Sequence, residues 1–186
     1  MTQADLYSMP FKAEYSDKVF AFGVLQHTPD VKRSFMTLIQ FLKLGGQLAI
    51  DVYRKEKWPT RWTSKYLWRP ITKRMPNFLL FPMVQWYVPR WLQFDNRLDE
   101  LTFLGRFAEH IRGIVPCWNY RGTLPLTEEQ IEAWAILDTF DALSPKYDHP
   151  QTIETVQSWF EEAKLADIEV RYGGNGILGC GTKPLL

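Results

Sequence analysis

The chain has 186 residues, a net charge of +1 and 46% apolar residues. This length allows one domain, or one domain with a sizeable insertion, and the apolar fraction excludes wholesale disorder. No run reaches the roughly 18 apolar residues of a membrane-spanning helix, and no secretory leader precedes the first expected strand. Cys117 and Cys180 lie too far apart in the sequence to suggest a disulfide framework or a metal motif. We therefore expect a cytoplasmic protein without a metal site.

Residues 19–53 are typical of a strand, a helix and a second strand. Val19–Val24 is an unbroken apolar run, which favours a parallel strand covered on both faces. Asp30 is placed to cap a helix whose apolar face recurs every three or four residues, and Gly45-Gly46 is expected to end that helix. That apolar face consists of Val31, Phe35, Leu38 and Leu42. Gln47–Tyr53 then forms the second strand. About 35 residues suit one right-handed βαβ crossover, so we expect an α/β fold.

Residues 54–149 interrupt this pattern and hold seven of the eight tryptophans. We expect several short helices here. Trp62 and Tyr66 lie four residues apart, and one helical edge is expected to be basic, with Pro70 interrupting its last turn. That edge consists of Arg61, Lys65, Arg69 and Lys73. The aromatic run Asn77–Val88 has two interpretations. It forms the insertion's own small core, or it forms an apolar substrate pocket or a membrane-interface face.

The charge of the chain is unevenly distributed. Residues 54–97 contain ten Lys or Arg and two acids, whereas residues 98–186 contain seven Lys or Arg and fourteen acids. Either the two parts neutralise each other or are simply solvated, or the basic part faces an anionic substrate or a membrane surface. A chain so close to neutral overall disfavours nucleic acid as the partner.

The last third of the chain returns to regular elements. Thr127 is placed to cap a helix that runs to Phe140, with Glu128 and Glu129 in its first turn. Residues 151–164 have an amphipathic helical pattern. Two short strands, 168–172 and 177–181, flank Gly173-Gly174-Asn175-Gly176 and predict a hairpin. We thus expect three parts: residues 1–53, a helical insertion over 54–149, and residues 150–186, which complete the core.

Three sequence segments carry a family resemblance. Residues 5–11 (DLYSMPF), 19–30 (VFAFGVLQHTPD) and 41–53 (FLKLGGQLAIDVY) resemble, in order and spacing, the second half of a class I S-adenosylmethionine-dependent methyltransferase core of the small-molecule type. The resemblance covers roughly the first 53 residues and, less tightly, the last 36. It implies a partial Rossmann-like sheet of parallel strands closed by a C-terminal antiparallel hairpin.

The resemblance also implies roles for particular residues. Asp5 would accept a hydrogen bond from the adenine amino group of the cofactor, with Leu6 beside it. Phe22, Gly23 and Val24 would line its methionine end. His27 would act as a general base toward an acceptor hydroxyl, because Gln26 replaces the histidine common there in relatives. The same resemblance extends to a Ser-Pro-x-Tyr-Asp-His segment, in which Tyr147 and His149 are candidates for binding the substrate. Each of these residues also has a plain structural interpretation, as a loop or capping residue.

The glycine-rich loop that follows the first strand in this family has no counterpart before Asp5. We therefore expect a methyltransferase core without its front half, acting on a small-molecule or lipid-like acceptor. The alternative is a non-catalytic pairing or regulatory module. On that view the apolar edge strand Val19–Val24 pairs with a second copy or with a separate front-half chain. Peripheral contact with a membrane is a further expected interaction.

Overall fold

The computed structural model describes residues 2–56, 64–100 and 105–185, and it divides the chain into two compact units. The first unit combines residues 1–55 with residues 147–186, and the second comprises residues 56–146. Each unit has its own cluster of buried apolar side chains. No helix in the described ranges is both long and apolar enough to cross a membrane.

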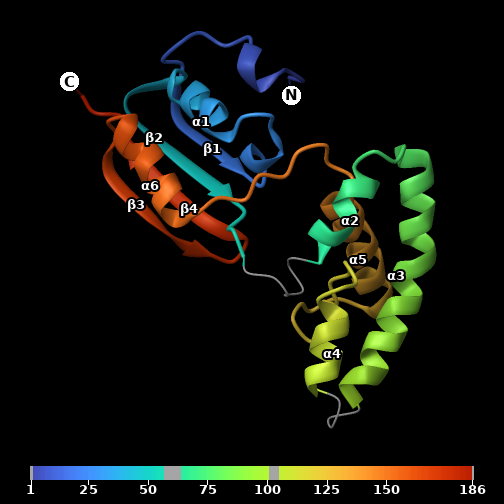
Figure 1. Cartoon of the computed structure of the whole chain (residues 1–186). Helices are drawn as coiled ribbons and strands as arrows, with labels where there is room; N and C mark the ends of the chain where they lie inside the picture. The colour runs from blue at the N-terminus through green and yellow to red at the C-terminus, as the bar shows by residue number, and fades with distance from the viewer. Residues whose placement is uncertain (1, 57–63, 101–104, 186) are drawn as a thin grey trace. The chain divides into compact units, whose positions relative to one another are not determined.

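The first unit is built on a four-stranded mixed sheet with the order β1-β2-β4-β3 (Figure 1). The strands are β1 (Ser16–Phe22), β2 (Leu42–Val52), β3 (Ala166–Gly173) and β4 (Gly176–Thr182). β1 runs parallel to β2, whereas β4 runs antiparallel to both β2 and β3. The predicted α/β class, with parallel strands and a C-terminal antiparallel hairpin, is confirmed. Two short 3-10 helices, η1 (Leu6–Ser8) and η2 (Leu25–His27), complete the N-terminal segment.

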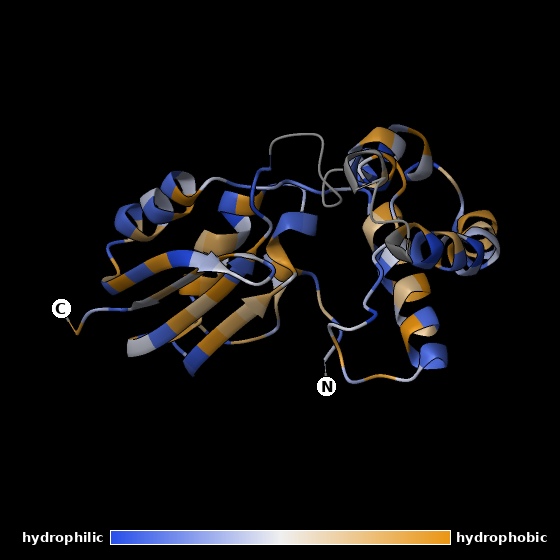
Figure 2. Ribbon diagram, turned by 90° about the horizontal axis from the view of Figure 1, so that it is seen from below, coloured by the Kyte–Doolittle hydropathy of each residue, from blue (hydrophilic) through white to orange (hydrophobic). Residues whose placement is uncertain are grey.

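Both helices of this unit cover the same face of the sheet (Figures 1 and 2). They are α1 (Val31–Ile39) and α6 (Ile153–Glu162), and Phe35 of one meets Phe160 of the other with ring centroids 4.8 Å apart. Beneath them lie the inward residues of the strands, including Leu48 and Ile50, both essentially inaccessible. Gly179 provides the space for Phe160, because a Cβ at this position would lie 2.6 Å from the Phe160 ring.

The opposite face of the sheet has no helix over it in the described part of the chain. The register places Phe20, Ala49 and Cys180 in one row across β1, β2 and β4. Phe22 lies in the next row, beside Asp51 and Leu178. Phe20 is 73% exposed and Phe22 is 55% exposed. The expectation that the first strand is covered on both faces is therefore wrong for this chain, because its alternate residues face solvent.

The boundaries of three early elements differ from those expected. β1 ends at Phe22 rather than Val24, because Gly23 has a φ of +67° and turns the chain out of the strand. α1 ends at Ile39, and Leu42 is already the first residue of β2. Gly45-Gly46 lies inside β2 at a bulge. The register shifts there, because Ser16 pairs with Leu42 whereas Lys18, two residues later, pairs with Gln47. These glycines accommodate an irregular strand, and they do not end the helix.

The second unit is helical. It contains α2 (Lys65–Thr72), α3 (Asn77–Glu100), α4 (Gly105–Arg112) and α5 (Glu128–Leu143). The expectation of several short helices is wrong for α3, which has 24 residues and accommodates two prolines within its length. α3 and α5 pack together around a buried apolar cluster, whose fully inaccessible members include Leu80, Val84, Val88 and Ala135. A buried ion pair links α3 to α4, with Arg112 Nε 2.6 Å from an Asp95 carboxylate oxygen.

The predicted basic edge of α2 is only partly exposed, because Lys73 faces solvent and the two residues before it on the edge do not. Lys65 and Arg69 are both buried, and the Arg69 guanidinium donates hydrogen bonds to the backbone carbonyls of Ala142 and Pro145 at 2.9 and 2.8 Å. Pro70 lies in the last turn of α2, and the helix continues through it to Thr72. Arg61 and Trp62, which belonged to the same prediction, lie outside the described residues. Residue spacing alone could not predict that backbone carbonyl groups of distant residues bind Arg69.

Candidate functional site

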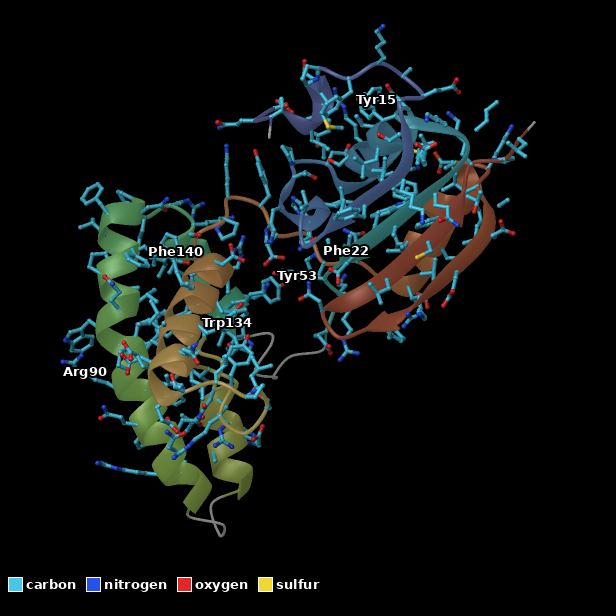
Figure 3. All side chains as sticks on the ribbon, turned by 180° about the vertical axis from the view of Figure 1, so that it is seen from behind. Tyr15, Phe22, Tyr53, Arg90, Trp134 and Phe140 are labelled. Carbon is cyan, nitrogen blue, oxygen red and sulfur yellow. The ribbon has the colours of Figure 1, made fainter. Side chains whose placement is uncertain are left out.

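The candidate site lies at the carboxyl ends of the parallel strands β1 and β2, the edge at which ligands bind in open α/β sheets. Phe22 ends β1 and Tyr53 follows β2, and both emerge at this end of the sheet (Figure 3). Gly23 adopts its positive φ beside open space, since a Cβ placed there would meet nothing within 4 Å. Phe22 and Val24 are exposed on either side of it. The three residues thus present backbone and apolar side chains to an approaching ligand.

His27 is held in one tautomer by the second chain segment of this unit. Its Nδ1 lies 3.0 Å from the backbone carbonyl oxygen of Tyr147. A carbonyl oxygen only accepts, so Nδ1 carries the hydrogen in this contact and Nε2 of the neutral ring holds the lone pair. Nε2 is buried and has no hydrogen-bond partner within the described ranges. The Tyr53 ring meets the imidazole edge-on at 5.4 Å, which fixes the orientation of the ring.

The segment at residues 147–151 is bound to the same strand end by backbone hydrogen bonds. The His149 amide donates to the Gln26 carbonyl at 2.9 Å, and the Gln151 amide donates to the Tyr53 carbonyl at 2.8 Å. The Tyr147 and His149 rings stack with centroids 5.9 Å apart. The structure therefore brings Tyr147 and His149 together with His27, from positions about 120 residues away in the sequence.

Asp5 and Leu6 lie on a different element from the other candidate residues. Asp5 caps η1, where one of its carboxylate oxygens accepts from the Tyr7 amide at 2.8 Å. The hydroxyl of Tyr7 accepts from the Asp30 amide at 3.3 Å and so ties η1 to the start of α1. Asp5 is exposed, and Leu6 packs partly against the core of the first unit. Asp5 thus has a local capping function in this structure.

Two polar residues at this edge are buried, which sequence reasoning did not predict. Asp51 is 6% exposed, and it accepts hydrogen bonds from the Asn175 side chain at 2.9 Å and from the Gly23 amide. Burial raises the pKa of the Asp51 carboxyl above its ordinary value, although both hydrogen bonds act in the opposite direction. Gln26 is fully buried, and neither atom of its side-chain amide has a hydrogen-bond partner in the described part of the chain. A charged residue inside an otherwise apolar strand was the available signal for Asp51.

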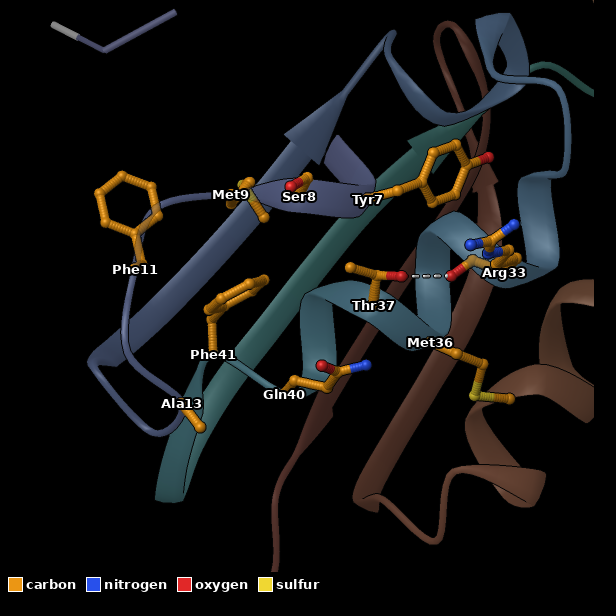
Figure 4. Close-up of a pocket in the computed structure, with 10 residues that line it drawn as sticks. All are labelled: Tyr7, Ser8, Met9, Phe11, Ala13, Arg33, Met36, Thr37, Gln40 and Phe41. Carbon is orange, nitrogen blue, oxygen red and sulfur yellow. Dashed lines mark hydrogen bonds between the residues drawn. The ribbon is translucent and has the colours of Figure 1, made fainter. Parts of the chain in front are cut away.

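A cleft of about 460 Å³ lies elsewhere in this unit, between the segment after η1 and the outer side of α1 (Figure 4). Its walls include Tyr7, Phe11, Arg33 and Phe41, and the Arg33 guanidinium lies 4.6 Å from the centroid of the Tyr7 ring. None of the predicted site residues lines it. The cleft is therefore separate from the edge that carries Gly23 and His27.

Comparison with known proteins supports a family assignment for the N-terminal segment. Residues 1–50 match the family model described as a methyltransferase domain. The chain is 28% identical over 122 residues to the 2-methyl-6-phytyl-1,4-hydroquinone methyltransferase, chloroplastic, of Spinacia oleracea, and 25% identical over 124 residues to the protein of that name from Arabidopsis thaliana. These alignments cover 64% and 66% of this chain. The chain spans only 29% and 30% of the length of these relatives.

Among solved structures, a SAM-dependent methyltransferase of Thermotoga maritima, titled a possible histamine N-methyltransferase, is 12% identical with a TM-score of 0.42. The match covers 97% of this chain and 62% of that one, but at this TM-score it adds nothing to the assignment. The family match is the informative finding. Residues 1–50, which supply β1, α1 and most of β2, match the methyltransferase-domain family. The resemblance inferred from the sequence is thereby confirmed.

Proposed function

We propose that this chain takes part in S-adenosylmethionine-dependent methyl transfer to a small, lipid-like acceptor. The observation that carries the proposal is the strand edge at Gly23 and His27, which lies within a segment that matches the methyltransferase family. The names of the two plant relatives refer to a hydroquinone with a phytyl tail, which is a lipid-like acceptor. That name supports the class of acceptor proposed here.

The residues at the strand edge fit one side of the cofactor. Gly23 leaves its backbone open to close approach, while Phe22 and Val24 offer apolar surface. Asp5 is exposed and retains acceptor capacity on its carboxylate, because η1 uses only one of its oxygens as a cap. S-adenosylmethionine, when bound, supplies a methyl group activated on a sulfonium centre. The remaining work of the protein is to align the acceptor and remove its proton.

His27 is the proposed general base. Its Nδ1–H is held by the Tyr147 carbonyl, so Nε2 would accept the proton from an acceptor hydroxyl once the groups that bury Nε2 in this structure move aside. The Tyr147 carbonyl is in this sense a positioning group, and the stacked Tyr147 and His149 rings would form part of the acceptor's apolar surroundings. Asp51 lies one hydrogen bond from Gly23 and is a further titratable group at this edge.

Isothermal titration of S-adenosylmethionine and S-adenosylhomocysteine into the purified chain tests the proposal first. We expect micromolar binding that is weakened by Gly23→Val, because a β-branched side chain disfavours a positive φ and would occupy the open space. His27→Gln serves as the comparison, since it should lower turnover by about 10²–10⁴-fold while leaving cofactor affinity intact. A folded chain that takes up neither ligand would contradict cofactor binding by this polypeptide on its own.

A second candidate function, pairing through β1, is favoured by one specific observation. β1 is the edge strand of the described sheet, and its outward Phe20 and Phe22 rings lie 5.8 Å apart on an exposed surface. An edge strand with exposed aromatic residues is a ready site for pairing with a second copy. Sedimentation velocity of Phe20→Lys, with Tyr172→Lys on the other edge strand β3 as control, tests this function. Association that persists in Phe20→Lys would exclude it.

A further inference from the structure

α3 exposes an apolar surface in its N-terminal half. Phe78, Leu79, Met83 and Trp86 are 74%, 52%, 37% and 63% exposed. At about 100° per residue these four side chains fall within an arc of about 140°, and Leu80, Val84 and Val88 lie on the other side of the helix. That other side packs against α5 within the second unit. We call the exposed side, with Arg90 at its end, the outer face of α3.

The charged residues of the segment that carries this face, residues 71–90, are all basic. Lys73 and Arg74 precede the apolar residues and Arg90 follows them, and all three side chains are exposed. Figure 3 shows Arg90 projecting from the side of α3 that faces away from α5. The guanidinium of Arg90 lies over the Trp86 ring, 4.6 Å from its centroid. Cations therefore border both ends of an aromatic surface.

The first acidic residue along α3 is not part of this surface. Asp95 is buried, and Arg112 neutralises it. An acidic group on α5, formed by Glu128, Glu129 and Glu132, borders α3 next to Pro89 and Gln93. These acids border the Arg90 end of the outer face, on the C-terminal side of Trp86. The N-terminal half of α3 thus has the charge pattern that complements an anionic partner.

We propose that the outer face of α3 docks on a lipid bilayer containing anionic lipids, with the helix axis in the plane of the interface. Tryptophan and phenylalanine with a few cations are the composition of helices that lie at a bilayer surface. The Trp86 ring would sit at the level of the headgroups, and Lys73, Arg74 and Arg90 would contact the lipid phosphates. This inference goes beyond the proposed function, because docking requires neither cofactor nor turnover.

A second copy of the chain is the competing occupant, and charge argues against it. A self-complementary dimer formed by two such faces would bring like charges of both copies close together, with no acid among residues 71–90 to compensate. An anionic bilayer has no such penalty. Its attraction for the face should weaken as salt is added, because exposed charges are screened.

Co-sedimentation of the full chain with vesicles tests the inference. The vesicles are made of phosphatidylcholine alone or of phosphatidylcholine with phosphatidylglycerol. We expect stronger binding to the mixed vesicles and a loss of this preference as salt is raised. The double variant Phe78→Ser/Trp86→Ser should bind the mixed vesicles at least about tenfold more weakly. Arg74→Glu/Arg90→Glu should bind both vesicle types equally weakly. Leu137→Ser, which removes a 60% exposed leucine from α5, is the matched control and should bind like the wild type.

A second measurement does not depend on the double variants remaining folded. Brominated phosphatidylcholine in the mixed vesicles should quench tryptophan fluorescence of the wild type. Trp86→Phe should lose much of that quenching while it still sediments with the vesicles. Binding that Phe78→Ser/Trp86→Ser retains, equal binding of the wild type to both vesicle types, or no binding at all would each overturn the inference. A vesicle-free dimer that this double variant abolishes would assign the face to a second copy instead.

Discussion

Asp51 is a residue whose environment should make the stability of the fold depend on pH. Its pKa is raised from an ordinary value of 3.8 by burial, so the folded state holds the proton to higher pH than the unfolded state does. The contribution of Asp51 to the stability of the fold is fully present below pH 3.8 and is lost as the pH rises through the pKa of the folded state. We therefore expect Asp51→Asn to gain stability relative to the wild type between pH 4 and pH 7, as measured by urea unfolding at both values.

Asp17→Asn is the control for this prediction. The Asp17 carboxylate is exposed and accepts a hydrogen bond from Lys43, which lowers its pKa. Its contribution is thus present above the ordinary pKa and is lost as pH falls, the reverse of Asp51. The change should be small, because solvent screens the pair. An equal stability difference at both pH values for Asp51→Asn would contradict the raised pKa.

Gly179 is a position where the absence of a side chain is required by a neighbouring ring. A Cβ there would lie 2.6 Å from the Phe160 ring and 3.4 Å from Ile50, within a close-packed core. We expect Gly179→Ala to lower the free energy of unfolding by about 1–3 kcal/mol. Gly174→Ala is the matched control, because a Cβ at the hairpin turn meets nothing within 4 Å. Equal melting temperatures for the two variants would show that the ring moves away freely.

The roles of residues that contact only their sequence neighbours could be predicted from the sequence. The roles of residues that depend on distant partners could not. Thr127 and Asp30 cap their helices as predicted, because a cap depends only on the following three residues. The burial of Asp51 and Gln26 was not predicted, because it is created by the packing of segments distant in the sequence. The predicted roles of Asp5, His27, Tyr147 and His149 remain predictions.

Among the elements, α5 allows a direct test of how much a helix cap predicted from the sequence contributes to stability. The Thr127 side chain accepts from the Gln130 amide at 3.3 Å, and the Gln130 side chain accepts from the Thr127 amide at 2.9 Å. This capping box satisfies two amides at the start of the helix that pairs with α3. We expect Thr127→Ala to cost about 1 kcal/mol, whereas Thr127→Gly should cost a few tenths. Thermal unfolding followed by circular dichroism measures both, and the reverse order would contradict the capping role.

The elements that sequence reasoning misjudged share a physical cause. Leu42 continued the helical spacing of Val31, Phe35 and Leu38, yet it begins β2, because the core of the sheet buries it completely. α3 was expected to be several short helices, since prolines weaken a helix interior. The buried side chains Leu80, Val84 and Val88 recur every four residues and hold one continuous helix through Pro82 and Pro89. In both cases tertiary packing outweighed local preference.

At the scale of the whole molecule, the two units have separate hydrophobic cores. The cluster around Phe35, Leu48 and Phe160 belongs to the first unit, and that around Leu80 and Val84 belongs to the second, with no member in common. The first cluster draws on segments from both ends of the chain, so its formation requires the N-terminal and C-terminal residues to meet. The second is assembled from residues within 56–146. Residues that share buried contacts unfold together, so a substitution in one core should destabilise mainly the unit that contains it.

Hydrogen exchange of the full chain tests this separation. Leu80 is fully buried in the second unit, and Leu80→Ala should lose about 2–5 kcal/mol of packing and cavity energy. We expect it to speed amide exchange in α3 and α5 while leaving β2 and β4 close to wild-type rates. Gly179→Ala, in the first unit, should do the reverse. Each variant is thereby the control for the other. Acceleration of both regions by either substitution would mean that the chain opens as one cooperative body, and a single unfolding free energy would then describe it.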